Sequence, residues 1–193
     1  MTSRRVTAVI LAGGRSSRFG RDKLVEAIDG RSLLLRAIDG VVPLATEILV
    51  VAAPDATPAV PEGVTLVHDP VAFEGPLAGL LAGLRVATEP VVLVVGGDMP
   101  SLVGAVLASM LAALHEPGID AVVLEHDGRS RPLPMALRRE PALATGDRLF
   151  RAGERRLRGL PEALATRTLP EATWRTLDPH AGTVRDVDTP ADL

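Results

Sequence analysis

Five short apolar runs rich in β-branched residues recur along the chain and constrain its fold more than any other feature. They are residues 6–11 (VTAVIL), 47–52 (EILVVA), 64–67 (VTLV), 91–95 (VVLVV) and 121–125 (AVVLE). These runs are nearly continuous in Val, Ile and Leu rather than alternating with polar residues. That pattern predicts strands that are buried on both faces, as in a parallel sheet covered by helices.

Helical patterns at residues 31–40, 77–88 and 101–115 separate the predicted strands. Ser101, which follows Pro100, is a candidate N-cap for the third helix. The alternation predicts an α/β fold, with a Rossmann-like, open, mainly parallel sheet that has helices on both faces. A length of 193 residues and a hydrophobic content of 47% suit a single domain over residues 1–193.

The last third of the chain is less regular. The run RSRPLPMALRRE (129–140) carries two prolines, which favours an edge strand or an extended loop. The run ERRLRGLPEALAT (154–166) predicts a helix with a break near Pro161, and TVRDVDTPADL (183–193) predicts a short strand, a turn and a final helical turn. The proline-rich residues 54–63 indicate a surface loop.

The composition excludes several classes of protein. The chain has 21 basic and 24 acidic residues, 2% aromatic residues and no tyrosine, so neither a basic footprint nor stacking platforms for nucleic acid are expected. The absence of cysteine excludes disulfides, thiolate metal sites and cysteine nucleophiles. No apolar run is long enough to cross a membrane. We therefore expect a cytoplasmic protein without nucleic-acid or membrane partners.

The glycine-rich segment LAGGRSSRFGRDK (11–23) leaves the carboxyl end of the first predicted strand. Ligands of open parallel sheets bind outside this end. Gly13 and Gly14 would let backbone N–H groups approach an anion, and Arg18 and Lys23 could reach phosphate oxygens. The spacing fits neither the GxGxxG dinucleotide fingerprint nor the GxxxxGK[ST] loop. The segment therefore predicts a different phosphate-binding loop.

This segment resembles the GGxxxRxGxxK loop of nucleotidyltransferases, and in particular the LAGGxSxRMGxDK loop of the molybdenum cofactor guanylyltransferase (MobA-like) family. Phe19 stands where that family usually has methionine. Further resemblances lie in HDP (68–70), EGPLAGLLAGL (74–84) and GGDMP (96–100). The closing DVDTPADL resembles NxNTPxDL, with Asp186 and Asp188 in place of the two asparagines. The resemblance implies the fold of the nucleotide-diphospho-sugar transferases.

The resemblance also implies roles for individual residues. The base and ribose would contact Leu11, Ala12 and Gly13. The triphosphate would contact Gly14, Arg18 and Lys23, and Asp69 would contact the nucleotide. Asp98, at the end of a buried strand, is a candidate ligand for Mg²⁺, which binds one or two carboxylates together with phosphate oxygens.

Several of these roles have structural alternatives that stay open. Asp98 could instead cap the following helix, and Asp69 could be a turn residue before Pro70. Asp188 is either a second metal ligand or a helix cap. The acceptor-binding residues implied by the resemblance are Pro76, Gly79, Arg131 and Pro132, although the last two could belong to an ordinary edge strand.

By this resemblance, the reaction transfers GMP from GTP to the terminal phosphate of molybdenum-molybdopterin and releases pyrophosphate. That acceptor is already ionised, so the chemistry needs positioning and charge neutralisation but no general base. Residues of about 1–100 would bind the nucleotide and residues of about 101–193 the acceptor. Transient contacts with cofactor-biosynthesis or molybdoenzyme partners are also implied.

The choice of base rests on Gly13. LAGG resembles the guanylyl branch, whereas the cytidylyl branch more often has alanine at this position, and DxDTP is common among cytidylyltransferases. A molybdopterin cytidylyltransferase that uses CTP is therefore the alternative enzyme. A nucleotide-binding adaptor without catalysis is the alternative from a different class, although Lys23 and Asp98 argue against it.

Overall fold

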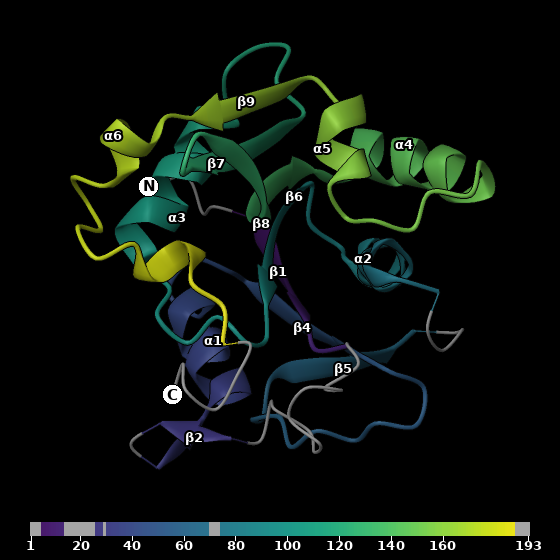
Figure 1. Ribbon diagram of the computed structural model, residues 1–193. Helices are drawn as coiled ribbons and strands as arrows, with labels where there is room; N and C mark the ends of the chain where they lie inside the picture. Colours follow the sequence, from purple (N-terminus) through teal and green to yellow (C-terminus); the bar gives the residue numbers. More distant parts are fainter. Residues whose placement is uncertain (1–4, 14–25, 29, 70–73, 188–193) are drawn as a thin grey trace.

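A single seven-stranded sheet runs through the middle of the molecule (Figure 1). The computed structural model describes residues 5–13, 26–28, 30–69 and 74–187. The sheet has the order β5-β4-β1-β6-β8-β7-β9. Its strands are β1 (Val6–Leu11), β4 (Glu47–Ala52), β5 (Val64–His68), β6 (Val91–Gly96), β7 (Ala121–His126), β8 (Arg129–Arg138) and β9 (Thr166–Leu169). A separate short antiparallel pair joins β2 (Ala27–Ile28) to β3 (Arg31–Ser32).

Most of the strand pairs are parallel. β5, β4, β1 and β6 pair in parallel, and β9 pairs in parallel with β7. Within the described part of the seven-stranded sheet, β8 alone runs antiparallel to its neighbours, β6 and β7. The expectation of an open, mainly parallel sheet is therefore confirmed, and each of the five predicted strands is present to within one residue.

Helices cover both faces of the sheet, as expected (Figure 1). One face carries α1 (Leu33–Val41), α3 (Gly104–Ala113) and the short α6 (Glu171–Trp174). The other face carries α2 (Pro76–Val86), α4 (Arg139–Arg151) and α5 (Gly159–Ala163). A 3-10 turn, η2 (Gly182–Val184), follows α6.

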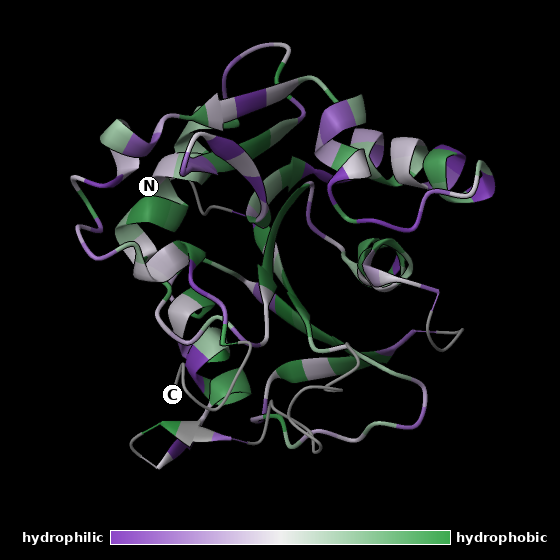
Figure 2. Cartoon of the chain, viewed as in Figure 1, coloured by the Kyte–Doolittle hydropathy of each residue, from purple (hydrophilic) through white to green (hydrophobic). Residues whose placement is uncertain are grey.

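The two apolar cores explain why the strand sequences are almost continuously hydrophobic. Along β1, Ala8 and Ile10 face the core beneath α1 and α3, while Val9 faces the core beneath α2. All three side chains are fully buried. Figure 2 accordingly shows the central strands largely in green, whereas the helices on either side are mixed green, white and purple. Burial of one such Val or Ile contributes about 1.5–3 kcal/mol.

The bounds of the three predicted helices differ from the sequence prediction by up to three residues, and the start of α3 differs most. Ser32 caps α1, because its Oγ accepts a hydrogen bond from the Leu35 N–H at 3.3 Å. Ser101 does not cap α3, so that prediction was wrong: the helix begins at Gly104, and Val103 is its N-cap residue. The Val103 N–H donates to Thr183 Oγ at 3.1 Å, so a distant side chain holds the start of α3.

β8 is an inner strand, so its prediction as an edge strand or extended loop was wrong. It lies between β6 and β7. Its two prolines are tolerated because the ladder is interrupted around them: pairing with β7 jumps from Val123–Met135 to Leu124–Arg131, and pairing with β6 begins at Met135. Pro132 and Pro134 therefore stand where no backbone N–H is needed for the ladder of hydrogen bonds.

Two further predictions in the last third were also wrong. Pro161 does not break a helix, because α5 begins at Gly159 and Pro161 lies in its first turn, where backbone N–H groups have no intrahelical partner. Residues 183–187 form no strand; η2 ends at Val184, and 185–187 are irregular. The sequence patterns also gave no indication of α4 or β9. Residues 54–63 form a loop, as predicted.

No helix in the described ranges is both long enough and apolar enough to span a lipid bilayer.

Gly83 is the point of closest approach between α2 and the sheet. A methyl group at this position would lie 2.8 Å from Val9 Cγ1 and 3.0 Å from Val51 Cγ2. Both neighbours are stiff β-branched side chains in strands. Gly83→Ala should therefore lower the free energy of unfolding by about 1–3 kcal/mol, the usual cost of overpacking.

Urea unfolding of Gly83→Ala beside Gly104→Ala tests this contact. Residue 104 starts α3, and a methyl group there meets no described atom within 4 Å. The Gly104 variant should be neutral or slightly stabilised, because alanine favours helix. Equal stability of the two variants would contradict the close packing of α2 on β1 and β4.

Candidate active site

The carboxyl ends of β1, β4 and β6 lie level with one another. Leu11, the last residue of β1, is paired with Val51 of β4 and with Gly96 of β6. Two backbone hydrogen bonds continue past the strands, from Ala12 N to Val51 O at 2.7 Å and from Gly97 N to Leu11 O at 2.9 Å. The loops that follow β1 and β6 therefore start side by side.

Asp69 lies at the same edge of the sheet. β5 is paired with β4 up to Ala52 and His68, and the Asp69 N–H then donates to Ala52 O at 2.9 Å. Asp69 is half-buried. Asp69, which is predicted to contact the nucleotide, therefore lies at the same edge of the sheet as the ends of β1 and β4.

The chain reverses its direction of travel across the sheet at β1. α1, on one face, leads from β1 to β4, whereas α2, on the other face, leads from β5 back to β6. The reversal in the direction of the chain therefore lies between the neighbouring strands β1 and β6. Ligands of open α/β sheets bind at such a switch point. Gly13 and Asp98 are described residues that follow these two strands.

The Asp98 carboxylate lies close over the end of β6. A methyl group on residue 96 would come within 2.5 Å of Asp98 Oδ1, so glycine is needed there for this side-chain position. Asp98 is half-buried. One carboxylate at this place fits Mg²⁺, a hard cation that prefers oxygen ligands and takes its others from phosphate groups and water.

The C-terminal segment reaches the same place. The Val187 N–H donates to Asp98 O at 3.0 Å, so the DVDTP motif begins beside GGDMP. Asp186 is exposed, and its Oδ1 lies 3.9 Å from an Arg131 guanidinium nitrogen. Asp188, the candidate second metal ligand, follows Val187 and lies outside the described residues.

Arg131 and Pro132 lie beyond the carboxyl end of β6. β8 runs antiparallel to β6 with Met135 opposite Val94, so the residues that precede Met135 extend toward Asp98. Arg131 Nε is buried and has no hydrogen-bond partner among the described residues. A buried guanidinium nitrogen without a partner is costly unless a ligand uses it, which favours a binding role for Arg131.

The GPLAG segment packs beside Asp69. Pro76 is the exposed first residue of α2, and a methyl group on Gly79 would lie 3.8 Å from Asp69 Oδ2. Gly75 has a φ of 95°, which favours glycine, and a methyl group there would lie 2.8 Å from Arg155 O. The Leu77 N–H donates to the same carbonyl at 3.2 Å.

Residues 154–158, which the sequence predicts as the start of a helix, form the loop that supplies the Arg155 carbonyl, so this part of the prediction was wrong. Glu154 organises this loop by accepting hydrogen bonds from the backbone N–H groups of Arg155 and Arg156, each at 2.9 Å. The Arg156 side chain, together with these N–H groups, lowers the pKa of Glu154 to about 2. The charged run GERRLR is the only sequence signal for this loop, and it does not reveal that the loop packs on α2.

The predicted nucleotide-binding residues fall into two groups. Those within the described residues lie at one edge of the sheet: Leu11, Ala12, Gly13, Asp69 and Asp98. Gly14, Arg18 and Lys23 lie outside the described residues. Gly13 is exposed, and a methyl group there would lie 3.9 Å from Ala53 N, the nearest described atom. The described backbone therefore does not itself require glycine at position 13.

A second cluster of polar side chains has a structural role. Possible ligand atoms of His126, Asp127 and Glu171 lie within 4.8 Å of one another. The Asp127 N–H donates to Glu171 at 2.8 Å, and Arg175 Nε donates to it at 3.0 Å. Both hydrogen bonds lower the pKa of Glu171, and the one from Asp127 has the larger effect. Arg175 already neutralises the charge of Glu171. We therefore infer that the cluster has a structural role, in which Glu171 holds α6 against the β7–β8 turn.

Comparisons with known proteins agree with this geometry. Residues 8–168 match the family described as MobA-like NTP transferase domain. A protein of Chloroflexus aggregans named "Probable molybdenum cofactor guanylyltransferase" is 38% identical over 195 residues, which cover 97% of this chain and 91% of that protein. The crystal structure of molybdopterin-guanine dinucleotide biosynthesis protein A from Archaeoglobus fulgidus has a TM-score of 0.78 at 22% identity, with 96% and 94% of the two chains covered.

One further structure bears on metal binding. A Mycobacterium tuberculosis protein, solved as a complex with manganese, is similar to this chain with a TM-score of 0.67 at 16% identity. The similarity covers 86% of this chain and 88% of that protein. At this level of identity it shows a shared fold.

Gly96→Ala tests whether glycine at this position sets the place of the Asp98 carboxylate. The added methyl group would displace Oδ1, the mobile end of a side chain, and would also press on Met99 Cγ at 3.2 Å. We expect a loss of stability of about 1 kcal/mol or less, because the carboxylate can move, but a roughly 10–100-fold loss of Mn²⁺ affinity.

Electron paramagnetic resonance of Mn²⁺ in the presence of nucleotide gives that affinity. Gly104→Ala is the matched control and should bind Mn²⁺ as the parent does. An unchanged affinity in Gly96→Ala would show that the cation does not depend on the position of this carboxylate.

Proposed function

Because the chain belongs to the MobA-like NTP transferase family, we propose that it is a molybdenum cofactor guanylyltransferase. It transfers GMP from GTP to the terminal phosphate of molybdenum-molybdopterin and yields the guanine dinucleotide cofactor and pyrophosphate. The observation that carries this proposal is the position of Asp98 just after β6, whose end is level with the end of β1, where the glycine loop starts. The guanylyltransferase name of the Chloroflexus relative supports the same reaction.

The residues would act by positioning and by charge neutralisation. The acceptor phosphate is ionised at neutral pH, so its oxygen can attack the α-phosphorus of GTP without a general base, and pyrophosphate leaves. Backbone groups of Leu11, Ala12 and Gly13 hold the base and ribose, and Asp69 contacts the nucleotide. The level ends of β1, β4 and β5 support this assignment, because they bring these residues to one edge of the sheet.

Asp98 would hold a divalent cation, which we propose to be Mg²⁺. Such an ion neutralises phosphate charge and orients the leaving group. The manganese complex of the Mycobacterium protein, which shares the fold, supports a divalent cation in general. Asp188 is proposed as a second ligand, because the hydrogen bond from Val187 to Asp98 starts its motif at this place.

Arg18 and Lys23 would neutralise the triphosphate, with backbone N–H groups at Gly14. Lys23 is the only lysine in the chain, whereas 20 of the 21 basic residues are arginines. Lysine offers a compact point charge for phosphate, while arginine offers a planar fork. A single lysine in the glycine loop is consistent with selection for that chemistry rather than for general surface charge.

The acceptor would bind in the second half of the chain, beyond residue 100. Arg131 is the main candidate, because its buried Nε has no partner among the described residues and the strand register places it past the end of β6. Pro132 adjoins it, and Pro76 and Gly79 would approach the acceptor from the start of α2. A molybdopterin phosphate fits the guanidinium by charge and by geometry.

A nucleotide panel tests the proposed function most simply. Purified protein with Mg²⁺ and molybdenum-molybdopterin is supplied with GTP, CTP or ATP, and the dinucleotide product and pyrophosphate are measured together. We expect equal amounts of both products with GTP. A preference for CTP would indicate the cytidylyltransferase, and nucleotide binding without pyrophosphate release would indicate the adaptor.

Asp98→Asn keeps the shape of the side chain and removes its charge. We expect turnover to fall by at least about 100-fold while the fold is retained, since electrostatic stabilisation of the transferred phosphate supplies much of the rate. Asp127→Asn is the control, because its φ of 52° suits asparagine and it lies in the structural cluster. Near-normal turnover in Asp98→Asn would refute the metal-binding role.

Gly13→Ala tests the choice of base. A methyl group at residue 13 has room among the described atoms, so its main effect should be on a base that lies against this backbone. We expect kcat/KM to fall by a factor equivalent to about 1–3 kcal/mol for GTP and much less for CTP. An unchanged ratio of the two values would show that Gly13 serves the turn alone.

A further inference from the structure

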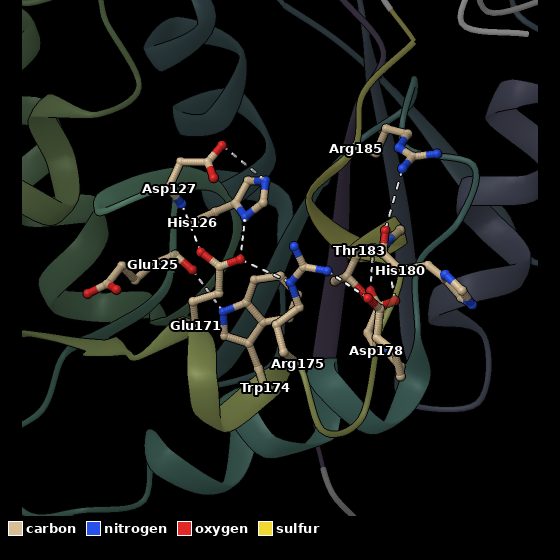
Figure 3. Close-up of polar contacts among 12 residues, drawn as sticks. Glu125, His126, Asp127, Glu171, Trp174, Arg175, Asp178, His180, Thr183 and Arg185 are labelled. Atoms are coloured by element: carbon tan, nitrogen blue, oxygen red, sulfur yellow. Dashed lines mark hydrogen bonds and ion pairs between the residues drawn. The ribbon is translucent and has the colours of Figure 1, made fainter.

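The segment that precedes the DVDTP motif is fastened by a buried carboxylate (Figure 3). We refer to residues 178–187 as the C-terminal strap. Asp178 lies just after α6 and is only 4% exposed. Its Oδ1 accepts the Gly182 N–H at 3.1 Å and its Oδ2 accepts the Thr183 N–H at 2.7 Å. The two carboxylate oxygens therefore stabilise the turn η2 within the strap.

That turn is in direct contact with the loop that bears Asp98. Thr183 is fully buried, and its Oγ accepts the Val103 N–H at 3.1 Å. Gly182 packs so tightly on Ser101 that a methyl group on it would lie 2.9 Å from Ser101 O. The strap thus holds the far end of residues 98–103, at the start of α3.

The strap also holds the near end of that loop. The Val187 N–H donates to Asp98 O at 3.0 Å, and the Val187 side chain is buried. Residues 98–103 are therefore tied at both ends to one segment, whose own shape depends on Asp178. Moving the strap would move the backbone from which the Asp98 carboxylate extends.

Asp178 is ionised at neutral pH in this arrangement. Burial alone would raise its pKa, but the hydrogen bonds from Thr183 and Gly182, together with the nearby Arg175 charge, outweigh burial and lower the pKa. Hydrogen bonds to a charged acceptor are shorter and stronger than neutral ones. A full negative charge in the strap therefore fixes the turn more firmly than a neutral side chain could.

We propose that Asp178 and Thr183 are positioning residues for the metal-binding carboxylate of Asp98, which they hold in place through the C-terminal strap and the loop 98–103. Neither residue touches substrate in this account. The inference deepens the proposed function and rests on the role of Asp98 given there. Residues that orient a metal ligand typically change metal affinity by about 10–100-fold when they are replaced.

Three variants of the full chain and one control separate positioning from simple stabilisation. Asp178→Asn removes the charge but keeps one acceptor oxygen. Thr183→Val removes the acceptor for Val103 N–H at nearly constant shape, and Thr183→Ser restores that acceptor. Glu171→Gln is the control, because Glu171 also accepts a backbone N–H and an arginine N–H, but fastens the β7–β8 turn instead of the loop 98–103.

The readout is the dissociation constant of Mn²⁺, measured by electron paramagnetic resonance with α,β-methylene GTP, a nucleotide that cannot be transferred. Trp174, the only tryptophan and fully buried, gives the unfolding midpoint of each variant by fluorescence. We expect Asp178→Asn and Thr183→Val to weaken Mn²⁺ binding about tenfold. Thr183→Ser and Glu171→Gln should bind Mn²⁺ like the parent.

Unchanged Mn²⁺ affinity in both Asp178→Asn and Thr183→Val would overturn the inference, as would equal weakening in Glu171→Gln. A parent that binds no Mn²⁺ would overturn it too. Failure of the proposed function gives a different result, namely no GMP transfer in the nucleotide panel while the Mn²⁺ affinities of the variants still differ as stated.

Discussion

The parallel register of β1 with β4 and β6 is the constraint on which the candidate site depends. Because Leu11 is level with both Val51 and Gly96, the glycine loop and the Asp98 loop start from the same edge. The chain reverses its direction across the sheet at β1, and ligands of open α/β sheets bind at such a switch point. A shift of one residue in this register would move Asp98 by about 3.3 Å and would exchange the side chains that face the two apolar cores.

The groups that would do the chemistry come from segments far apart in the sequence. The glycine loop follows residue 11, the candidate metal ligand is residue 98, and the strap that ties it ends at residue 187. Arg131 reaches the same edge because β8 runs back along β6. A negatively charged ligand would thus meet backbone N–H groups, one cation-binding carboxylate and an arginine, an arrangement that suits transfer between phosphates.

Much of the fold could be predicted from the sequence, because strands buried on both faces leave long runs of Val, Ile and Leu. The positions of Leu11, Asp69 and Asp98 followed from strand ends alone. The inner position of β8 could not be predicted, since Pro132 and Pro134 are tolerated only where the ladder is interrupted. The strap was missed for a different reason: hydrogen bonds such as that from Val103 to Thr183 join residues 80 apart and leave no periodic pattern.

The central claim is that the glycine loop and Asp98 form one site for a metal-bound guanine nucleotide. Because Lys23 is the only lysine, the rate at which an amine-reactive ester labels its side chain, measured by peptide mass spectrometry, tests the claim directly. GTP with Mg²⁺ should slow labelling in proportion to occupancy, ATP should do so much less, and the protection by GTP should weaken when Mg²⁺ is removed. Labelling at the same rate with and without saturating GTP and Mg²⁺ would contradict the claim.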